Sequence, residues 1–293
     1  MHALAQEAPA LPGTAPLRAW ARPFLLAFTG LTLLMLGNQV WRRFGQLASD
    51  RFALDQAVKV VLLCLPFIVA MTLPAAVLLS AAYVFSRPGV RLSPARSLAG
   101  QLAPTLLVAL GLSLAAWVLV DQVLPRTNFE LRRVLIALSR RTPEAAPADA
   151  SKGDREMTTA EMSAVVRDAE VQLVQATASG DLEASTAAAD RVAQYRVEIQ
   201  KKGAIAAACL VFALAGAGVG MQLRGRRWWL PLGAGVALFG LYYVGLVLGE
   251  SLANQRQLSP VLAMWGGNLL FALLGALLLL RQGGAASVRQ APA

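Results

Sequence analysis

The sequence predicts an all-α integral membrane protein, with six transmembrane helices in a 3+3 arrangement around a short extracytoplasmic helical insert. Apolar residues make up 56% of the 293 residues and charged residues only 15%, which is unusual for a soluble domain of this length. Three charge-free apolar stretches precede a charged middle segment and three follow it, each close to or above the ~20 residues that span a bilayer core. The six stretches are Pro23 to Trp41, Val60 to Phe85, Ser97 to Val120, Gly203 to Leu223, Trp228 to Gly249 and Gln257 to Leu280.

The absence of charge within the stretches favours membrane helices over buried helices of a soluble protein. One Arg or Asp at the bilayer centre costs about 3 kcal/mol on insertion scales, whereas a soluble helix would carry a continuous polar face. The first stretch is expected to remain as an anchor. Its apolar run is too long for a signal peptide, and Trp41, Arg42 and Arg43 follow it in place of a small-residue cleavage site.

Charge asymmetry predicts the orientation in the membrane. The tails and short loops of one side carry a net charge of +9 and those of the other side +1, while the middle segment is neutral. The positive-inside rule therefore predicts both termini in the cytoplasm and the middle segment outside it. The basic loops are expected to attract anionic membrane lipids. Nucleic-acid binding is not expected, because the Arg residues are scattered over several loops without interleaved aromatic residues.

The middle segment is expected to be helical. Ala and Gln are frequent there, and β-branched alternation is scarce. Thr158 and Glu161 have the spacing of a capping box ahead of a helix through Ala178, and Gly180 then interrupts the pattern. A second helix from residue 182 is expected to reach residue 202 and to continue into the fourth span.

The chain accordingly divides into three predicted parts. Residues 1–124 hold the N-terminal tail and the first three spans, 125–202 the helical insert, and 203–293 the last three spans and the C-terminal tail. Within the insert, a basic amphipathic pattern from Thr127 to Arg140 precedes a linker from Thr142 to Gly153. The insert could serve as a solvated spacer or as a binding module.

Catalytic chemistry is not expected in this chain, nor is a metal site or a cofactor. The one histidine is His2, and the two cysteines, Cys64 and Cys209, both lie within predicted spans without ligand-spacing partners. The Gly-rich run from Gly216 to Gly220 lies inside a span, where small residues favour close helix packing. Any ATP hydrolysis would come from a separate subunit.

Several segments in a fixed order resemble the LptF/LptG (YjgP/YjgQ) permeases of lipopolysaccharide export. They cover most of the chain outside the termini and agree with the family's 3+3 layout. The segments are LPFIVAMTLPAAVLL with the following FSR (Leu65 to Leu79 and Phe85 to Arg87), DQVLPRTN (Asp121 to Asn128), DREMT (Asp154 to Thr158), VEIQKK (Val197 to Lys202), CLVFAL (Cys209 to Leu214) and LAMWGGN (Leu262 to Asn268).

The resemblance implies a permease subunit of an ABC transporter. Such a subunit pairs with a second LptF/LptG-type permease and is driven by an LptB-type cytoplasmic ATPase. The glycolipid would enter sideways between first and fifth spans and leave toward a periplasmic bridge protein. Arg42 and Arg43 match the position whose basic side chains meet lipid A phosphates, which suits guanidinium groups. The alternative is an interfacial anchor formed with Trp41.

Two segments differ from the family pattern. A helical insert stands where the family carries a periplasmic β-jellyroll. The loop from Ser86 to Pro104, which in the family docks on the ATPase through an acidic residue, has none here, so Arg87, Arg91 and Arg96 would make that contact. These differences leave a second hypothesis open: a non-transporting membrane scaffold or a degenerate paralogue of the permease.

Overall fold

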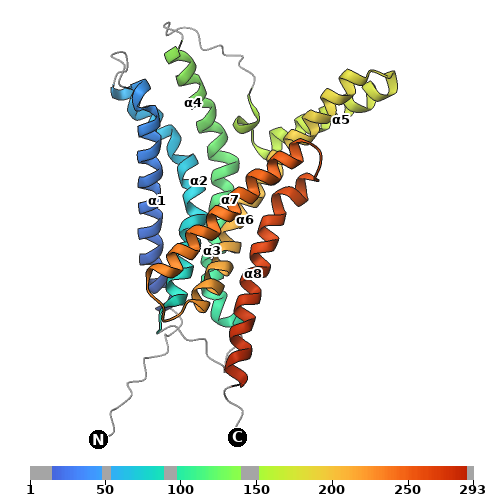
Figure 1. Ribbon diagram of the computed structural model, residues 1–293. Helices are drawn as coiled ribbons and strands as arrows, with labels where there is room; N and C mark the ends of the chain where they lie inside the picture. Colours follow the sequence, from blue (N-terminus) through green and yellow to red (C-terminus); the bar gives the residue numbers. More distant parts are fainter. Residues whose placement is uncertain (1–14, 48–53, 89–97, 140–151, 289–293) are drawn as a thin grey trace, which may run out of the picture.

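The computed structural model describes residues 15–47, 54–88, 98–139 and 152–288, and every regular element in these ranges is helical (Figure 1). The elements are α1 (Ala15–Leu47), α2 (Leu54–Ser86), α3 (Leu98–Val118), the π-helical turn η1 (Leu119–Val123), α4 (Leu124–Ser139), the 3-10 turn η2 (Asp154–Glu156), α5 (Thr159–Ser179), α6 (Leu182–Gln222), α7 (Trp229–Asn254) and α8 (Pro260–Val288).

The predicted fold class is confirmed. Within the described ranges, six helices are long and apolar enough to cross a membrane: α1, α2, α3 with its continuation, α6, α7 and α8. The start of α1 and the end of α8 lie at one end of the bundle. At the opposite end stand α4 and the hairpin of α5 and α6, and α7 crosses the bundle diagonally (Figure 1).

The third span continues beyond the end that the sequence predicts. The third apolar stretch ends at Val120, and the sequence analysis assigns the amphipathic pattern from Thr127 to Arg140 to the insert. In the structure, η1 joins α3 directly to α4, and Pro125 lies buried near the start of α4. A π-helical turn shifts the hydrogen-bond register within a helix and changes the direction in which its side chains point. Here it turns the carboxylate of Asp121 inward, where that side chain is buried.

Helix α6 is the central element of the bundle and packs on α2, α3, α5, α7 and α8. Small residues allow this close packing. A Cβ on Gly216 would lie 2.6 Å from the Leu78 carbonyl oxygen of α2, and one on Gly218 would lie 2.9 Å from the Gly275 carbonyl oxygen of α8. The predicted packing role of this glycine run is therefore supported on two faces of one helix.

The insert forms the predicted helical hairpin. Thr158 caps α5: its hydroxyl accepts from Glu161 N, and the Glu161 carboxylate accepts from Thr158 N at 2.7 Å. Gly180 ends α5 with a φ of +71°, a conformation in which a side chain would be strained. Helix α6 then runs without a break from Leu182 through the fourth span, as the sequence predicted.

The Glu161 carboxylate also accepts a hydrogen bond from the Lys152 ammonium at 2.5 Å. This bond, followed by the one from the Thr158 backbone, lowers the pKa of the Glu161 carboxyl. The start of α5 is thus held in a charged capping arrangement, and the charge of Glu161 also complements the helix N-terminus.

Candidate functional site

A buried polar cluster joins the insert to the membrane bundle, and Asp121 of η1 is its centre. One carboxylate oxygen, Oδ1, accepts from Thr159 N at 2.7 Å and from Thr159 Oγ1 at 2.5 Å. The other oxygen accepts from Gln122 Nε2 at 2.8 Å. Thr159 is the first residue of α5, so the carboxylate lies at the helix N-terminus, where negative charge is favourable.

Lys202 of α6 completes the cluster. Its ammonium lies 3.3 Å from Asp121 Oδ1 and donates to the Met157 carbonyl oxygen at 2.6 Å. Both charged residues are buried, Asp121 at 3% and Lys202 at 7% exposure. Burial of a charge is costly unless it is paired and hydrogen-bonded, and here both conditions are met. We call Asp121, Lys202, Thr159 and Met157 the outer junction.

A second layer of polar contacts fastens α4 to the turn that precedes α5. Arg132 pairs with the buried Glu156 at 2.9 Å, and the same Glu156 oxygen accepts from Gly153 N at 3.0 Å. The Asn128 side-chain amide donates to the Arg155 carbonyl oxygen at 3.1 Å. The chain between η2 and α5 is therefore tied to α4 as well as to α6.

Two further ion pairs connect α6 with the end of α7 and the turn that follows it. Lys201 reaches both Glu198, one turn earlier in α6, and Glu250 of α7 at 2.8 Å. Arg256, in the turn between α7 and α8, pairs with Asp190 of α6. Ion pairs thus connect α6 with α7 and with the turn before α8 at the end of the bundle that carries the insert.

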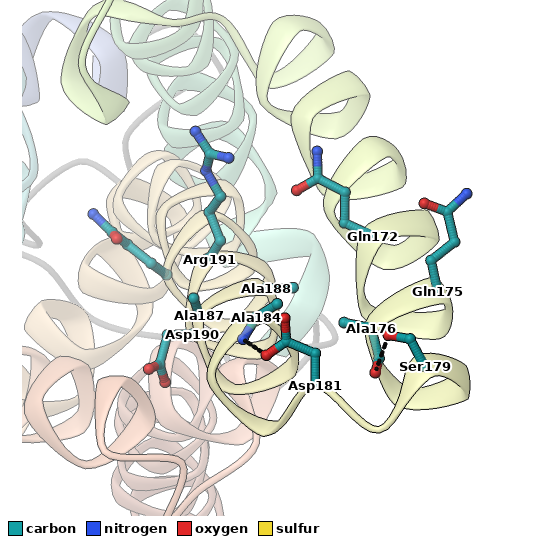
Figure 2. A pocket seen from close by; sticks show the side chains of 11 residues that line it. Gln172, Gln175, Ala176, Ser179, Asp181, Ala184, Ala187, Ala188, Asp190 and Arg191 are labelled. Carbon is teal, nitrogen blue, oxygen red and sulfur yellow. Dashed lines mark hydrogen bonds between the residues drawn. The ribbon is translucent and has the colours of Figure 1, made fainter.

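Near its tip the hairpin has a polar groove of about 820 Å³ between α5 and α6. Figure 2 shows Gln172 and Gln175 on α5 and Arg191 on α6, and alanines of both helices also line the groove. The small alanine side chains leave space between the two helices at this point. The groove brings together side-chain amides and charged groups of both signs.

Comparison with known proteins places this architecture in a family. The chain matches the family described as lipopolysaccharide export system permease LptF/LptG over residues 17–87 and 142–281. The chain belongs to the LptF/LptG permease family. A search of curated proteins found no match. Family membership and the six apolar helices make this chain a multi-pass inner-membrane protein and a permease component of the lipopolysaccharide-export type.

Three of the segments quoted in the sequence analysis meet at the outer junction, of which DREMT and VEIQKK lie within the family match and DQVLPRTN lies outside it. Asp121 begins DQVLPRTN, Met157 belongs to DREMT, and Lys202 ends VEIQKK. These segments are up to 81 positions apart in sequence, yet their side chains and backbone share one hydrogen-bonded cluster. These three segments therefore attach the insert to the third and fourth spans.

The structure places the predicted lipid-phosphate residues at the far end of α1. Arg42 and Arg43 lie in its last two turns, at the same end of the bundle as the outer junction (Figure 1). Their neighbour Trp41 is 80% exposed on the bundle surface. The assignment of Arg42 and Arg43 to lipid phosphates stays a prediction.

Of the predicted ATPase-contact residues, Arg87 is the one that the structure describes, and Arg91 and Arg96 lie outside the described residues. Arg87 follows the end of α2 and is exposed. Its guanidinium lies over the Tyr83 ring, 4.7 Å from the centroid, and donates to the Tyr83 hydroxyl at 3.0 Å. The structure does not bring Arg87 near Arg42 and Arg43, since the two groups stand at opposite ends of the bundle.

Asp121 and Lys202 both lie within the motifs of the sequence analysis, which assigns no role to either residue. Their positions relative to the apolar stretches nevertheless indicate that they could pair. Asp121 is the first charge after the third apolar stretch, and Lys202 is the last charge before the fourth. Opposite charges that directly bound two antiparallel spans lie at the same membrane depth, so they are candidates for pairing.

Proposed function

We propose that this chain is one permease subunit of an ABC-type lipopolysaccharide export complex. It pairs with a second LptF/LptG-type permease and is driven by a separate LptB-type cytoplasmic ATPase. Together the two permeases extract the glycolipid laterally from the inner membrane and pass it toward a periplasmic bridge protein. The observation that carries this proposal is the family match over both halves of the chain.

The surfaces of the first and fifth spans support lateral entry. Helix α1 packs mainly on α2, with a smaller contact to α3, so one broad side of α1 stays uncovered. Helix α7 packs on α2, α6 and α8 and also keeps an uncovered apolar side. Such faces suit contact with lipid tails or with a partner permease. The exposed apolar residues include Leu26, Leu33 and Leu34 on α1, and Val236, Leu241 and Val244 on α7.

The outer junction supports a mechanical role for the insert. Because α4, α5 and α6 are joined by buried charges and hydrogen bonds, a movement of the third or fourth span moves the hairpin with it. In this proposal, the helical insert takes the position of the family's jellyroll in the exit path, and the chain keeps its division into parts 1–124, 125–202 and 203–293.

The proposed orientation places both termini in the cytoplasm and the insert in the periplasm. The ends of α1 and α2 then carry two different basic sites. Arg42 and Arg43 stand on the periplasmic side, where they would bind the lipid A phosphates. Arg87, with Arg91 and Arg96, stands on the cytoplasmic side and would contact the ATPase.

The test is purification of the full chain from native membranes under mild detergent. We expect the second permease and the ATPase to co-purify, and we expect a lipid A glycolipid to stimulate ATP hydrolysis by the complex. The variant R42Q/R43Q should lose most of this stimulation. The matched control is R167Q, which removes one exposed arginine on the same side, in α5. Failure to recover any ATPase would contradict the proposal.

A second candidate function is a non-transporting membrane scaffold, a degenerate paralogue of the permease. It is favoured by the helical hairpin that stands where a permease of this family carries its exit domain. Depletion of the protein separates the two candidates. Accumulation of glycolipid in the inner membrane supports the permease, and unchanged surface lipopolysaccharide supports the scaffold.

A further inference from the structure

The turn between α6 and α7 presents two arginines followed by two tryptophans at the end of the bundle that holds the start of α1 and the end of α8, which the proposed orientation makes the inner end (Figure 1). We call Arg226, Arg227, Trp228 and Trp229 the inner Arg-Trp loop. Both arginines are exposed, and the indole residues are 70% and 50% exposed. Two adjacent tryptophans cannot be so exposed to water without cost, since each carries a large apolar surface.

The inner Arg-Trp loop is held in a fixed position by its backbone. Gly225 has a φ of +73°, and its N–H donates to the Ser86 carbonyl oxygen at the end of α2, at 3.3 Å. Arg226 N donates to the Leu223 carbonyl oxygen at 3.1 Å, and Leu230 N to that of Arg227 at 3.0 Å. The side chains of the loop therefore start from a short, hydrogen-bonded turn.

The charge of this end is unbalanced. None of the ion pairs within the described residues includes Arg226 or Arg227. The described stretches that form this end, residues 15–22, 83–88, 98–101, 222–231 and 280–288, contain no Asp or Glu. Arg87 adds a further positive charge beside the loop, because Gly225 bonds to the residue before it. The two exposed arginines therefore have no carboxylate partner within these described stretches.

The tryptophans indicate which kind of anion suits these arginines. Trp228 and Trp229 stand directly at the start of an apolar membrane span, where indole rings favour the headgroup region of a bilayer. An arginine beside such a ring lies at the depth of lipid phosphates, which its guanidinium can bind through two hydrogen bonds. A soluble acidic protein would match the arginines alone, whereas a lipid matches the arginines and the tryptophans together.

We propose that the inner Arg-Trp loop is a binding site for the phosphate headgroup of an anionic glycerophospholipid of the adjacent leaflet. Arg226 and Arg227 bind the phosphate, while Trp228 and Trp229 lie at the boundary between headgroup and acyl chains. This site is separate from the lipid-phosphate residues proposed at Arg42 and Arg43, which lie at the other end of the bundle. It does not depend on whether the chain transports lipid.

The experiment uses the full chain reconstituted in vesicles of phosphatidylcholine and phosphatidylglycerol, with bromine on the acyl chains of one lipid at a time. Bromine quenches nearby indole fluorescence, and the variant W228F/W229F identifies the part of the signal that comes from the loop. We expect phosphatidylglycerol to be preferred about fivefold over phosphatidylcholine at this site at low salt, as two arginines at a membrane surface allow. The preference should fall to near onefold in R226Q/R227Q and should persist in the control R167Q/R191Q.

Soluble glycerol phosphate, added as a competitor, should leave the preference unchanged, because it lacks the acyl chains that the tryptophans meet. Equal quenching by the two lipids in the unsubstituted protein would overturn the proposal, as would an undiminished preference in R226Q/R227Q. Retained lipid preference with loss of ATPase co-purification in R226Q/R227Q would also overturn it and would identify the loop as a protein-docking surface. Native mass spectrometry of retained phosphatidylglycerol provides a second readout that does not depend on the tryptophans.

Discussion

The outer junction and the inner Arg-Trp loop differ in the burial and pairing of their positive charges. At the outer junction, Lys202 is buried and shares an aspartate with the N-terminus of α5. At the inner loop, Arg226 and Arg227 are exposed, and no ion pair within the described ranges includes them. The outer charges are therefore committed to the fold of this chain, whereas the inner charges remain available to lipids or partners.

Substitutions at the outer junction should therefore change stability, and substitutions at the inner Arg-Trp loop should change interactions. A buried pair loses stability when one member is removed, because the other is left desolvated and uncompensated. An exposed charge contributes little to stability, since water and salt screen it.

The largest expected effect is that of Asp121→Ala. It removes the charged partner of the buried Lys202 and the acceptor of two hydrogen bonds that Thr159 donates, so we expect the free energy of unfolding to fall by about 3–5 kcal/mol. The measurement is thermal unfolding of the protein in mild detergent. The double variant D121A/K202A should be less destabilised than the sum of the two single variants. An unchanged melting temperature for D121A would show that the junction does not hold the insert.

Lys201→Ala should have a smaller effect, of about 2 kcal/mol. Lys201 is largely buried and joins Glu198 to Glu250 of α7, so its removal leaves two carboxylates without a shared cation. The control is Arg133→Ala, which removes an exposed pair with Glu130 within α4 and should cost less than about 0.5 kcal/mol. Equal decreases in melting temperature for the two variants would contradict the prediction that buried ion pairs contribute more to stability than exposed ones.

Acidification should loosen the start of α5 slightly. The folded pKa of Glu161 lies below its ordinary value of 4.5, so its contribution to stability is present above that value and is lost as pH falls through the folded pKa. The melting temperature of the unsubstituted protein should therefore fall more than that of Glu161→Gln on moving from about pH 6 to about pH 3.5. The difference should be small, because the side chain is partly exposed and screened. An equal fall in the melting temperature of the two proteins over this pH range would contradict the prediction.

The smallest expected stability effect belongs to R226Q/R227Q. Both side chains are exposed and outside the packed core, so we expect a change within about 0.5 kcal/mol in detergent. The same variant should nevertheless change lipid preference, as argued above. A large loss of stability in detergent would mean that the inner loop, like the outer junction, is part of the fold.

Much of the fold could be predicted from local pattern. Six apolar stretches bounded by charge predict six spans, because an unpaired charge within a bilayer is costly. Thr158, Glu161 and Gly180 set the beginning and end of α5 through short-range hydrogen bonds and backbone geometry, and the structure confirms these bounds. The extended third span could not be predicted in the same way, since a π-helical turn has no reliable local pattern and α4 follows it without a break.

The features of the candidate site likewise separate into those that depend on local pattern and those that depend on long-range contacts. Composition and short-range patterns are enough to predict the membrane class, the helical insert, the family resemblance and the excess of arginine in the loops at one end, because each depends on residues that are close together in the chain. The hydrogen bond between Asp121 and Thr159, the ion pair of Asp121 with Lys202, and the hydrogen bond from the turn before Trp228 to the end of α2 depend on the tertiary structure. These contacts join residues 38 to 139 positions apart, and such pairs form only when the packing of α2, α6 and α3 brings them together.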